Sequence, residues 1–466
     1  MSAATGAVSG PAGAPGTRRL SRGVIAGYAA GSVGTGGFGT VPGLLLLIYL
    51  TDELGVAATL AAVVVFLPKA WDVILNPLVG TWSDRTKSRW GPRVPWMLAG
   101  AIILPIFFVL MFSVPGLTGG GAAAYVIVMF LLAATGYAFF QVPYVAVPAE
   151  ITDSYRERTT MTAIRIVVLT LAILVFGAGA PLIVDAGGDG LAGYRLMGLV
   201  AAVVLFLGFM GAVIGIRKAP IVVRAEPEGS LREQLVAIRE NRDFRVLFLS
   251  FVIQALAVGA MLAATPYVAT YLLGDEKATT LLFAALVGPA ILVMPLWRLV
   301  AGRSGKERGF LYATLVFLVG ALTLTFTRGL PTVAVIGAVA LCGIGYAGMQ
   351  MFPLAMLPDT IHVDTLQTGR RRAGTFTGVW TAGETAGLAL GPALYAGVLA
   401  MGGYISSTSS NVADQPDSAL LAIALGFGLV PGILIAVSIP LLRRYRLTEA
   451  ALVELETRAA ETQPDA

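Results

Sequence analysis

The sequence contains few charged residues. Asp, Glu, Lys and Arg make up 13% of the 466 residues, and hydrophobic residues make up 56%. Soluble domains carry about 25% charged residues, so this composition excludes an ordinary soluble protein and predicts an all-α protein embedded in a lipid bilayer. The net charge of +5 is expected to set orientation in the membrane, and we expect no nucleic-acid partner.

Cysteine and histidine are almost absent. The single cysteine, Cys342, excludes an internal disulfide and a thiolate metal cluster, and the single histidine, His362, excludes a multi-histidine metal site. The sequence also shows no nucleophile–base arrangement and no phosphate-binding loop. We therefore expect neither an enzyme nor a bound metal or cofactor.

Twelve apolar runs are long enough to cross the roughly 30 Å hydrocarbon core of a bilayer. They lie near residues 24–50, 57–82, 95–115, 122–148, 162–184, 195–216, 246–273, 278–301, 309–327, 331–356, 374–401 and 419–442. The longest polar interruption, residues 217–245, falls near mid-chain and carries helically spaced leucines that indicate a surface helix. It divides the chain into two halves of six helices each.

Lys and Arg alternate between the two sides of these runs. Residues 84–93 and 369–372 are strongly basic, whereas residues 402–418 contain no Lys or Arg. Basic loops stay in the cytoplasm, so we expect a multi-pass protein of the cytoplasmic membrane with both termini inside. The expected organisation is a disordered tail (1–20), a six-helix bundle (21–216), a connector (217–245), a second bundle (246–445) and a cytoplasmic tail (446–466).

The second apolar run carries three polar residues on one helix face, Lys69, Asp72 and Asn76. A charged side chain at mid-membrane costs about 2.5–3.5 kcal/mol on insertion scales, so it usually faces a cavity or a partner. Asp72 is the strongest candidate for coupling to a proton or cation, and Asn76 can add a carbonyl oxygen. The alternative for Asp72 is a structural pairing with Lys69, which could instead bind solute or snorkel.

Polar side chains also occur in the fourth apolar run, where Tyr137, Gln141 and Tyr144 surround Pro143. Proline frees a backbone carbonyl, which membrane helices tolerate where they line a cavity. Hydroxyl and amide groups at these positions suit hydrogen bonding to a polar solute. Ordinary hydrogen bonding between helices is the alternative interpretation.

The fifth and eleventh runs each contain an embedded charge, Arg165 and Glu384. Arg165 either faces the cavity or snorkels to the surface. Glu384 is embedded in an apolar stretch of the second half, which favours a coupling role. Trp380 precedes it by one turn and could stack on a sugar ring or anchor packing.

Several motifs resemble those of a known family. Residues 80–85, GTWSDR, match the G-x-x-x-D-R loop of major facilitator proteins. Residues 69–72 (KAWD), 76–80 (NPLVG), 90–95 (WGPRVP) and 142–148 (VPYVAVP) extend this match and resemble the glycoside–pentoside–hexuronide:cation symporters, relatives of melibiose permease. The resemblance implies a major facilitator fold of two pseudo-symmetric six-helix bundles. It also implies alternating access that moves a sugar-like solute with coupled H⁺ or Na⁺.

The resemblance assigns roles to individual residues and also shows departures. Asp72 matches the family's first cation-site acid and Arg165 its helix-five arginine. Asn76 and Gln141 stand where the melibiose-type proteins have further acids, and Thr385 is nearest to a helix-eleven lysine that is missing here. The loss of oxygen ligands argues against a melibiose-type Na⁺ site. Proton coupling through Asp72 or Glu384, or uncoupled transport, is therefore the expectation.

Two sets of residues follow from this interpretation. The expected solute ligands are Lys69, Tyr137, Gln141, Tyr144, Arg165, Trp380 and Thr385. The expected cytoplasmic gate comprises Gly80, Asp84, Arg85, Arg93, Arg156 and Arg158. The scarcity of sugar-binding acids leaves an alternative open, the export or flipping of an amphiphile such as a drug, lysolipid or natural product. Nothing in the sequence indicates an oligomer, so we expect a monomer.

Overall fold

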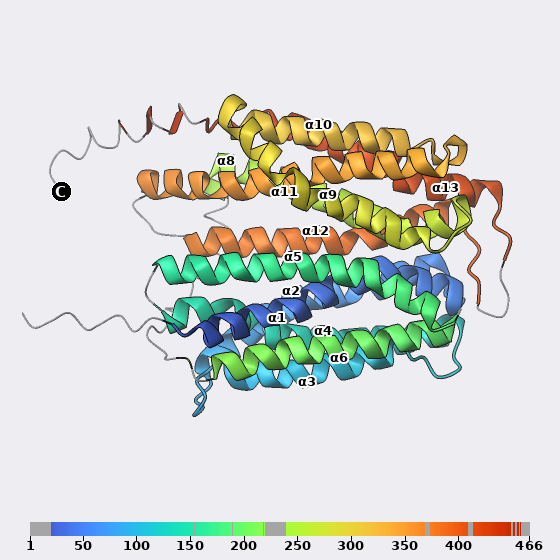
Figure 1. Ribbon diagram of the computed structural model, residues 1–466, viewed down its shortest axis with the longest axis horizontal. Coiled ribbons are helices and arrows are strands. Elements are labelled where there is room, and N and C mark those ends of the chain that lie inside the picture. Colours follow the sequence, from blue (N-terminus) through green and yellow to red (C-terminus); the bar gives the residue numbers. More distant parts are fainter. Residues whose placement is uncertain are drawn as a thin grey trace, which may run out of the picture.

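A computed structural model describes residues 20–152, 155–188, 190–217, 219, 239–368, 373–408, 413–448, 451–452, 454–455 and 457. Within these ranges the chain is helical, apart from loops and a single antiparallel bridge between Leu54 and Thr408. The helices lie along the long axis of the molecule, and the first and last described helices begin and end at the same end of it (Figure 1).

The first half contains six long helices. They are α1 (Arg22–Val41) with its π-helical continuations η1 (Pro42–Leu46) and η2 (Tyr49–Glu53), α2 (Ala58–Arg85), α3 (Val94–Met111), α4 (Gly119–Ile151), α5 (Tyr155–Ala186) and α6 (Leu191–Ile216). The second half repeats the pattern. It contains α8 (Arg242–Tyr267) with η3 (Val268–Leu272), α9 (Ala278–Ser304), α10 (Lys306–Leu324), η4 (Thr327–Gly329), α11 (Thr332–Thr368), α12 (Ala373–Met401), α13 (Asp417–Phe427) and α14 (Leu429–Leu442).

Eleven helices in the described ranges are long and apolar enough to cross a membrane, counting α13 and α14 as one. The first helix supplies the twelfth, because α1, η1 and η2 run without a break from Arg22 to Glu53. The sequence prediction of twelve spans therefore agrees with the structure. Its connector and tails lie largely outside the described residues, including 218, 220–238 and 1–19.

The helices form two bundles. In the first, α1 packs against α5 and α6, α3 against α4 and α6, and α2 against α4; in the second, α8 packs against α12 and α14, and α11 against α9 and α10. Contacts between the bundles run from α2 to α12, from α5 to α9 and from η1 to α8. Figure 1 shows the first bundle, in blue to green, below the second, in yellow to red.

Glycine allows neighbouring helices to approach closely. A Cβ atom on Gly27 of α1 would lie 2.6 Å from the Cα atom of Gly215 on α6. A Cβ atom on Gly100 of α3 would lie 2.5 Å from the carbonyl oxygen of Gly136 on α4. Small residues at such crossings are how membrane helices gain packing energy when lipid and protein are equally apolar.

The two ends of the bundle differ in their charges. We call the end that contains Arg22, Arg85, Arg93 and Lys306 the basic end, because these residues begin or end helices there. The opposite end, which we call the distal end, contains the η2–α2 turn and the loop that follows α12. This division matches the alternation of basic loops in the sequence.

Candidate functional site

The second helix brings a charge pair into the interior of the first bundle. Asp72 is only 6% exposed, and its Oδ2 atom lies 3.9 Å from the ammonium nitrogen of Lys69. That nitrogen also lies over the rings of Phe38 and Phe130, at 5.6 and 6.0 Å from their centroids. The pair is loose, and Asp72 Oδ1 has no hydrogen-bond partner in the described part of the chain. Asp72 therefore retains a free oxygen for a proton, a water molecule or a solute hydroxyl.

Asn76 does not share this environment. It is exposed, whereas Leu75 and Val79 continue the buried face of α2 below Asp72 and pack beside Ala138 of α4. Residues three and four positions apart share a helix face, so Asn76 and Leu75 both lie one turn after Asp72. The role of Asn76 as an oxygen ligand beside Asp72 stays a prediction.

Tyrosines from α4 connect Asp72 to α5. Tyr137 packs against Phe38 with ring centroids 4.8 Å apart and lies within electrostatic range of both Asp72 and Arg165. The Arg165 guanidinium lies over the ring of Tyr144, 5.3 Å from its centroid. The fold therefore gathers Lys69, Asp72, Tyr137, Tyr144 and Arg165 from three helices; their role in binding or coupling stays a prediction.

Tyr144 also fixes the first helix to the fourth. Its hydroxyl donates to the carbonyl oxygen of Tyr28 at 2.6 Å and lies 2.9 Å from the hydroxyl of Ser32. The rings of Tyr28 and Tyr144 stack at 4.6 Å. These contacts hold Tyr144 in place, so that both its hydroxyl and its ring meet Arg165.

Two further polar atoms near this site lack partners. Gln141 Oε1 and Arg165 Nε are buried without a hydrogen-bond partner among the described residues, as is Asp72 Oδ1. Buried polar atoms are nearly always hydrogen-bonded, and exceptions occur where a ligand or water binds. One donor and two acceptors on α2, α4 and α5 form a set that complements the hydroxyl groups of a polar solute.

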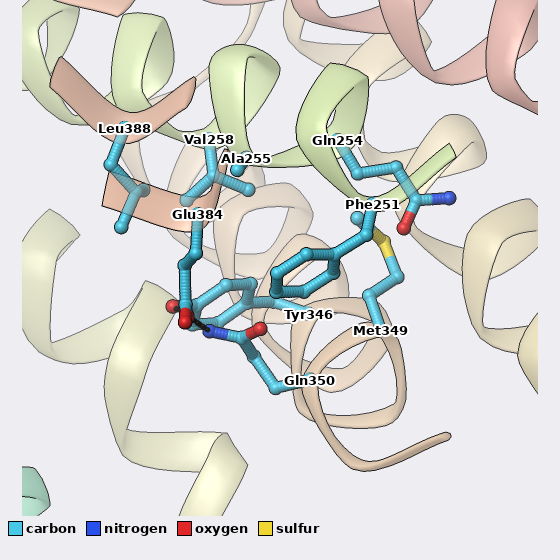
Figure 2. Close-up of a pocket in the computed structure, with 9 residues that line it drawn as sticks. All are labelled: Phe251, Gln254, Ala255, Val258, Tyr346, Met349, Gln350, Glu384 and Leu388. Carbon is cyan, nitrogen blue, oxygen red and sulfur yellow. Dashed lines mark hydrogen bonds between the residues drawn. The ribbon is translucent and has the colours of Figure 1, made fainter. Parts of the chain in front are cut away.

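In the second bundle, Glu384 of α12 faces α11 (Figure 2). Gln350 donates to Glu384 Oε1 at 3.4 Å and to the hydroxyl of Tyr346 at 3.0 Å. These groups line a small cavity together with Gln254 and apolar side chains such as Leu388. Glu384 is therefore inside the second bundle, with neutral amide and phenol groups around it.

The other two residues expected on α12 lie elsewhere. Trp380 is 2% exposed and stacks on Phe251 with centroids 4.4 Å apart, with Phe244 and Phe248 at its edges. Its ring faces are used in aromatic packing, which is the alternative that the sequence left open. Thr385 is exposed, and its hydroxyl donates to the carbonyl oxygen of Thr381 in its own helix at 2.9 Å.

The basic end contains a charge network centred on Arg93. This guanidinium, 8% exposed, donates from Nε to Glu150 Oε1 at 2.8 Å and also binds Ser83 and Asp84. Burial alone would lower the pKa of Arg93, but its bonds to Glu150 and Asp84 raise it overall, so the cation is firmly held. Glu150 did not stand out in the sequence, because it follows Pro148 at the end of an apolar run.

The remaining residues of the expected gate are less informative. Arg85 is exposed, and Gly80 lies where a Cβ atom would be 3.7 Å from Val142. The side chains of Arg156 and Arg158 lie outside the described residues. The partners that the structure gives Arg93 all belong to the first bundle, so the network stabilises that bundle at its basic end.

The distal end contains a cluster that the sequence analysis missed. We call it the distal clasp: Thr51 and Asp52 from the first bundle, and Tyr267, Tyr271 and Tyr404 from the second. Thr51 and Tyr267 are joined by hydroxyls 2.7 Å apart, and Tyr271 donates to Asp52 Oδ2 at 2.7 Å. In the sequence, Asp52 lies directly after an apolar run and looks like an ordinary loop acid.

Backbone contacts strengthen the clasp. The Ser407 amide donates to the Thr51 carbonyl oxygen at 2.7 Å, and the Ser406 hydroxyl donates to the Val56 carbonyl oxygen at 2.7 Å. Farther along the same end, the Thr280 hydroxyl of α9 donates to a carbonyl oxygen of α5 at 3.1 Å. These hydrogen bonds hold the two bundles together at the distal end.

Comparison with known proteins agrees with this architecture. The family model described as MFS/sugar transport protein matches residues 27–449. The putative glycoside/cation symporter YagG of Escherichia coli (strain K12) is 27% identical over 456 residues, covering 94% of this chain and 96% of the relative. The isoprimeverose transporter of Lactiplantibacillus pentosus is 25% identical, covering 89% and 87%.

A solved structure shows the same fold at low sequence identity. The nucleoside transporter NupG has a TM-score of 0.62 and 13% identity, with 91% of this chain and 100% of that chain covered. At this identity the similarity concerns the fold alone. The family model spans nearly the whole chain, both bundles included, and the chain therefore belongs to the MFS/sugar transport protein family of the major facilitator superfamily.

Proposed function

We propose that this protein is a secondary active symporter of the cytoplasmic membrane that moves a sugar- or glycoside-like solute with a proton. The single observation that carries the proposal is the cluster of polar groups in the first bundle, where Asp72, Gln141 and Arg165 each keep a buried polar atom without a partner in the described chain. Family membership and the names of its symporter relatives support the solute class.

Each polar group has a chemical role in this proposal. Arg165 Nε donates to a solute hydroxyl or ring oxygen, Gln141 Oε1 accepts from a second hydroxyl, and the Tyr137 phenol offers either. A polyhydroxylated solute satisfies several of these atoms at once, which favours it over an apolar one. Asp72 holds the coupling proton, and Lys69 is the counter-ion of its charged form.

The geometry around Asp72 favours H⁺ over Na⁺. An ammonium group 3.9 Å from the carboxylate repels a metal cation, and the buried residues that follow Asp72 on α2, Leu75 and Val79, are apolar. Na⁺ and similar hard cations need several oxygen ligands around one point. A proton needs only one carboxylate oxygen, and Asp72 Oδ1 has room for it.

The arrangement of the bundles suggests which state the structure represents. With the basic end in the cytoplasm, as the positive-inside rule favours, the distal clasp closes the outer face. A closed outer face is part of an alternating-access cycle in which one bundle rocks against the other about a fixed site. The outward-facing state then requires the clasp to separate.

Ligand screening tests this proposal directly. Purified protein is heated with panels of glycosides, pentosides, sugar acids and amphiphiles, across pH and with or without Na⁺. A ligand that binds the folded state raises the melting temperature. At a concentration of 100 times its Kd it stabilises the folded state by about 2.7 kcal/mol. Stabilisation by a sugar derivative without any Na⁺ requirement, followed by uptake of that compound into proteoliposomes, supports the proposal. Stabilisation and movement of lysolipids or drugs alone would replace it with amphiphile transport.

A further inference from the structure

The carboxylate of Asp52 joins the two bundles at the distal end. Thr51 donates to its Oδ1 atom at 2.6 Å, and Tyr404 donates to the same atom at 2.5 Å. Tyr271 donates to Oδ2 at 2.7 Å, and its hydroxyl lies 3.0 Å from that of Tyr404. Both tyrosines belong to the second bundle, so these bonds exist only while the distal end is closed.

The surroundings of Asp52 are acidic and neutral. It is partly buried and lines a distal cavity together with Glu53 and Asp185 of the first bundle and Glu276 of the second. The phenol of Tyr194 from α6 lines the same cavity. In the described part of the chain Asp52 has no ion pair with Lys or Arg.

A cation at the distal end, Arg195, is bonded elsewhere. Arg195 at the start of α6 donates to the carbonyl oxygen of Val114 at 3.2 Å. Among the described residues, the second bundle presents to Asp52 the hydroxyl groups of Tyr271 and Tyr404 and the carboxylate of Glu276. A carboxylate that leaves water for such a place meets no compensating positive charge, which disfavours its charged form.

Closure therefore changes the acidity of this group. In the closed clasp Asp52 is withdrawn from water and shares its cavity with the carboxylate of Glu276, which disfavours its charged form, while the bonds from Thr51, Tyr404 and Tyr271 offset part of this effect. In an open clasp, Asp52 would be in water with an ordinary pKa near 4. The closed state thus binds the proton more tightly than the open state does.

We propose that Asp52 is a second proton-binding site, separate from Asp72, and that the distal clasp closes when Asp52 takes a proton and opens when it releases that proton to the distal solvent. The proton on Asp52 enters from and returns to the distal solvent. It therefore makes gating depend on pH without changing the number of protons that cross the membrane with each solute. The inference depends on opening of the distal end during the proposed cycle.

The sign of the effect follows from linkage. Because the pKa is higher in the closed state, closure is fully favoured below the open-state pKa and is lost as the pH rises to the closed-state pKa. Between these two values, one proton changes the ratio of closed to open protein by about tenfold per pH unit. Above the closed-state pKa the ratio becomes constant again.

A buried thiol reports the opening without any transported solute. Val56 is 0% exposed, and its carbonyl oxygen accepts the hydrogen bond from Ser406 across the clasp. A Val56→Cys variant is made with Cys342→Ser, because the native cysteine, although buried, is the one other thiol. Labelling of this thiol by a water-soluble methanethiosulfonate is followed from pH 4.5 to 8.5 in nanodiscs. At each pH the labelling rate is divided by the rate for the same reporter in Asp52→Asn. This labelling ratio cancels the effect of ionisation of the thiol itself.

The labelling ratio is expected to rise by up to about tenfold per pH unit between the open-state and closed-state pKa values of Asp52, because loss of the proton opens the clasp. In Asp52→Asn the neutral amide keeps the clasp closed at every pH. Glu276→Gln, which removes the neighbouring charge, is expected to move the window to lower pH; its labelling rate can be divided by that of the reporter with native Asp52, so this comparison does not need Asp52→Asn to fold. Asp417→Asn is the matched control, since this exposed acid at the same end binds Arg328 and should change nothing. A flat ratio, or a window that Glu276→Gln leaves in place, would overturn the proposal whether or not Asp72 couples transport.

Discussion

Replacing Asp72 with Asn should uncouple transport while leaving the protein folded. The amide has nearly the same shape and fills the same buried position, but it cannot carry a proton. A symporter that moves one positive charge with each neutral solute gains about 2.3 kcal/mol from a membrane potential of 100 mV. Each 1.4 kcal/mol is a factor of ten, so the wild type should accumulate solute about 40-fold at this potential, and Asp72→Asn should only equilibrate it.

The assay uses proteoliposomes with an imposed potassium diffusion potential and the solute found by screening. Counterflow, which needs no net proton movement, should survive in Asp72→Asn and shows that the solute still binds. If Asp72→Asn loses both accumulation and counterflow, the missing proton carrier is not the explanation. The substitution also leaves the Lys69 ammonium, over Phe38 and Phe130, without its counter-ion.

The double variant Lys69→Gln/Asp72→Asn separates these causes. If Asp72 carries the proton, the double variant remains uncoupled although its charge balance is restored. Removing one member of a buried pair costs up to about 3–5 kcal/mol, but the long 3.9 Å contact and the 20% exposure of the Lys69 side chain place this pair at the low end. Uphill accumulation by either variant would refute the role given to Asp72.

Three further predictions concern other residues. Glu384→Gln should leave uphill uptake largely intact, since Glu384 is bonded to Gln350 inside the second bundle; loss of accumulation with normal counterflow would move the coupling role from Asp72 to Glu384. Arg165→Lys should weaken solute binding by about 10- to 100-fold, seen as a raised KM, because an ammonium cannot reproduce the Nε donor; an unchanged KM would remove Arg165 from the site. Glu150→Gln should lower thermal stability by about 1–3 kcal/mol by weakening the buried pair with Arg93, whereas Glu157→Gln, whose carboxylate accepts from the Leu20 amide near the surface, should cost less.

The fold followed from the sequence because its signals are long and local. Apolar runs of about 20 residues and alternating basic loops set the number and direction of the spans, and nearly every predicted span overlaps a helix in the structure. The interior position of Asp72 followed from the cost of placing a charge in lipid. These arguments need no knowledge of which helices become neighbours.

The errors arose where the answer depends on neighbours. Asn76 shares a helix face with Asp72, but the sequence could not show that Leu75 would be buried there and Asn76 exposed. Trp380 has the same local sequence whether it meets a solute or Phe251, and only the packing of α8 against α12 decides. Glu150 likewise gains its partner, Arg93, from a different helix.

The distal clasp was missed for a related reason. Asp52 follows an apolar run by two residues, which is where a solvated acid normally lies. Its partners, Tyr271 and Tyr404, are 219 and 352 residues away in the sequence, and no local pattern links them. The two halves of the chain had to be brought together before the group could be recognised.

Solute-driven proton movement tests the central claim most directly. Wild-type protein in lightly buffered, de-energised vesicles receives a pulse of the solute identified by screening, and the external pH is recorded. The account predicts a transient alkalinisation equivalent to one proton per solute molecule, absent in Asp72→Asn. Solute entry without alkalinisation, or with a strict requirement for Na⁺, would contradict it.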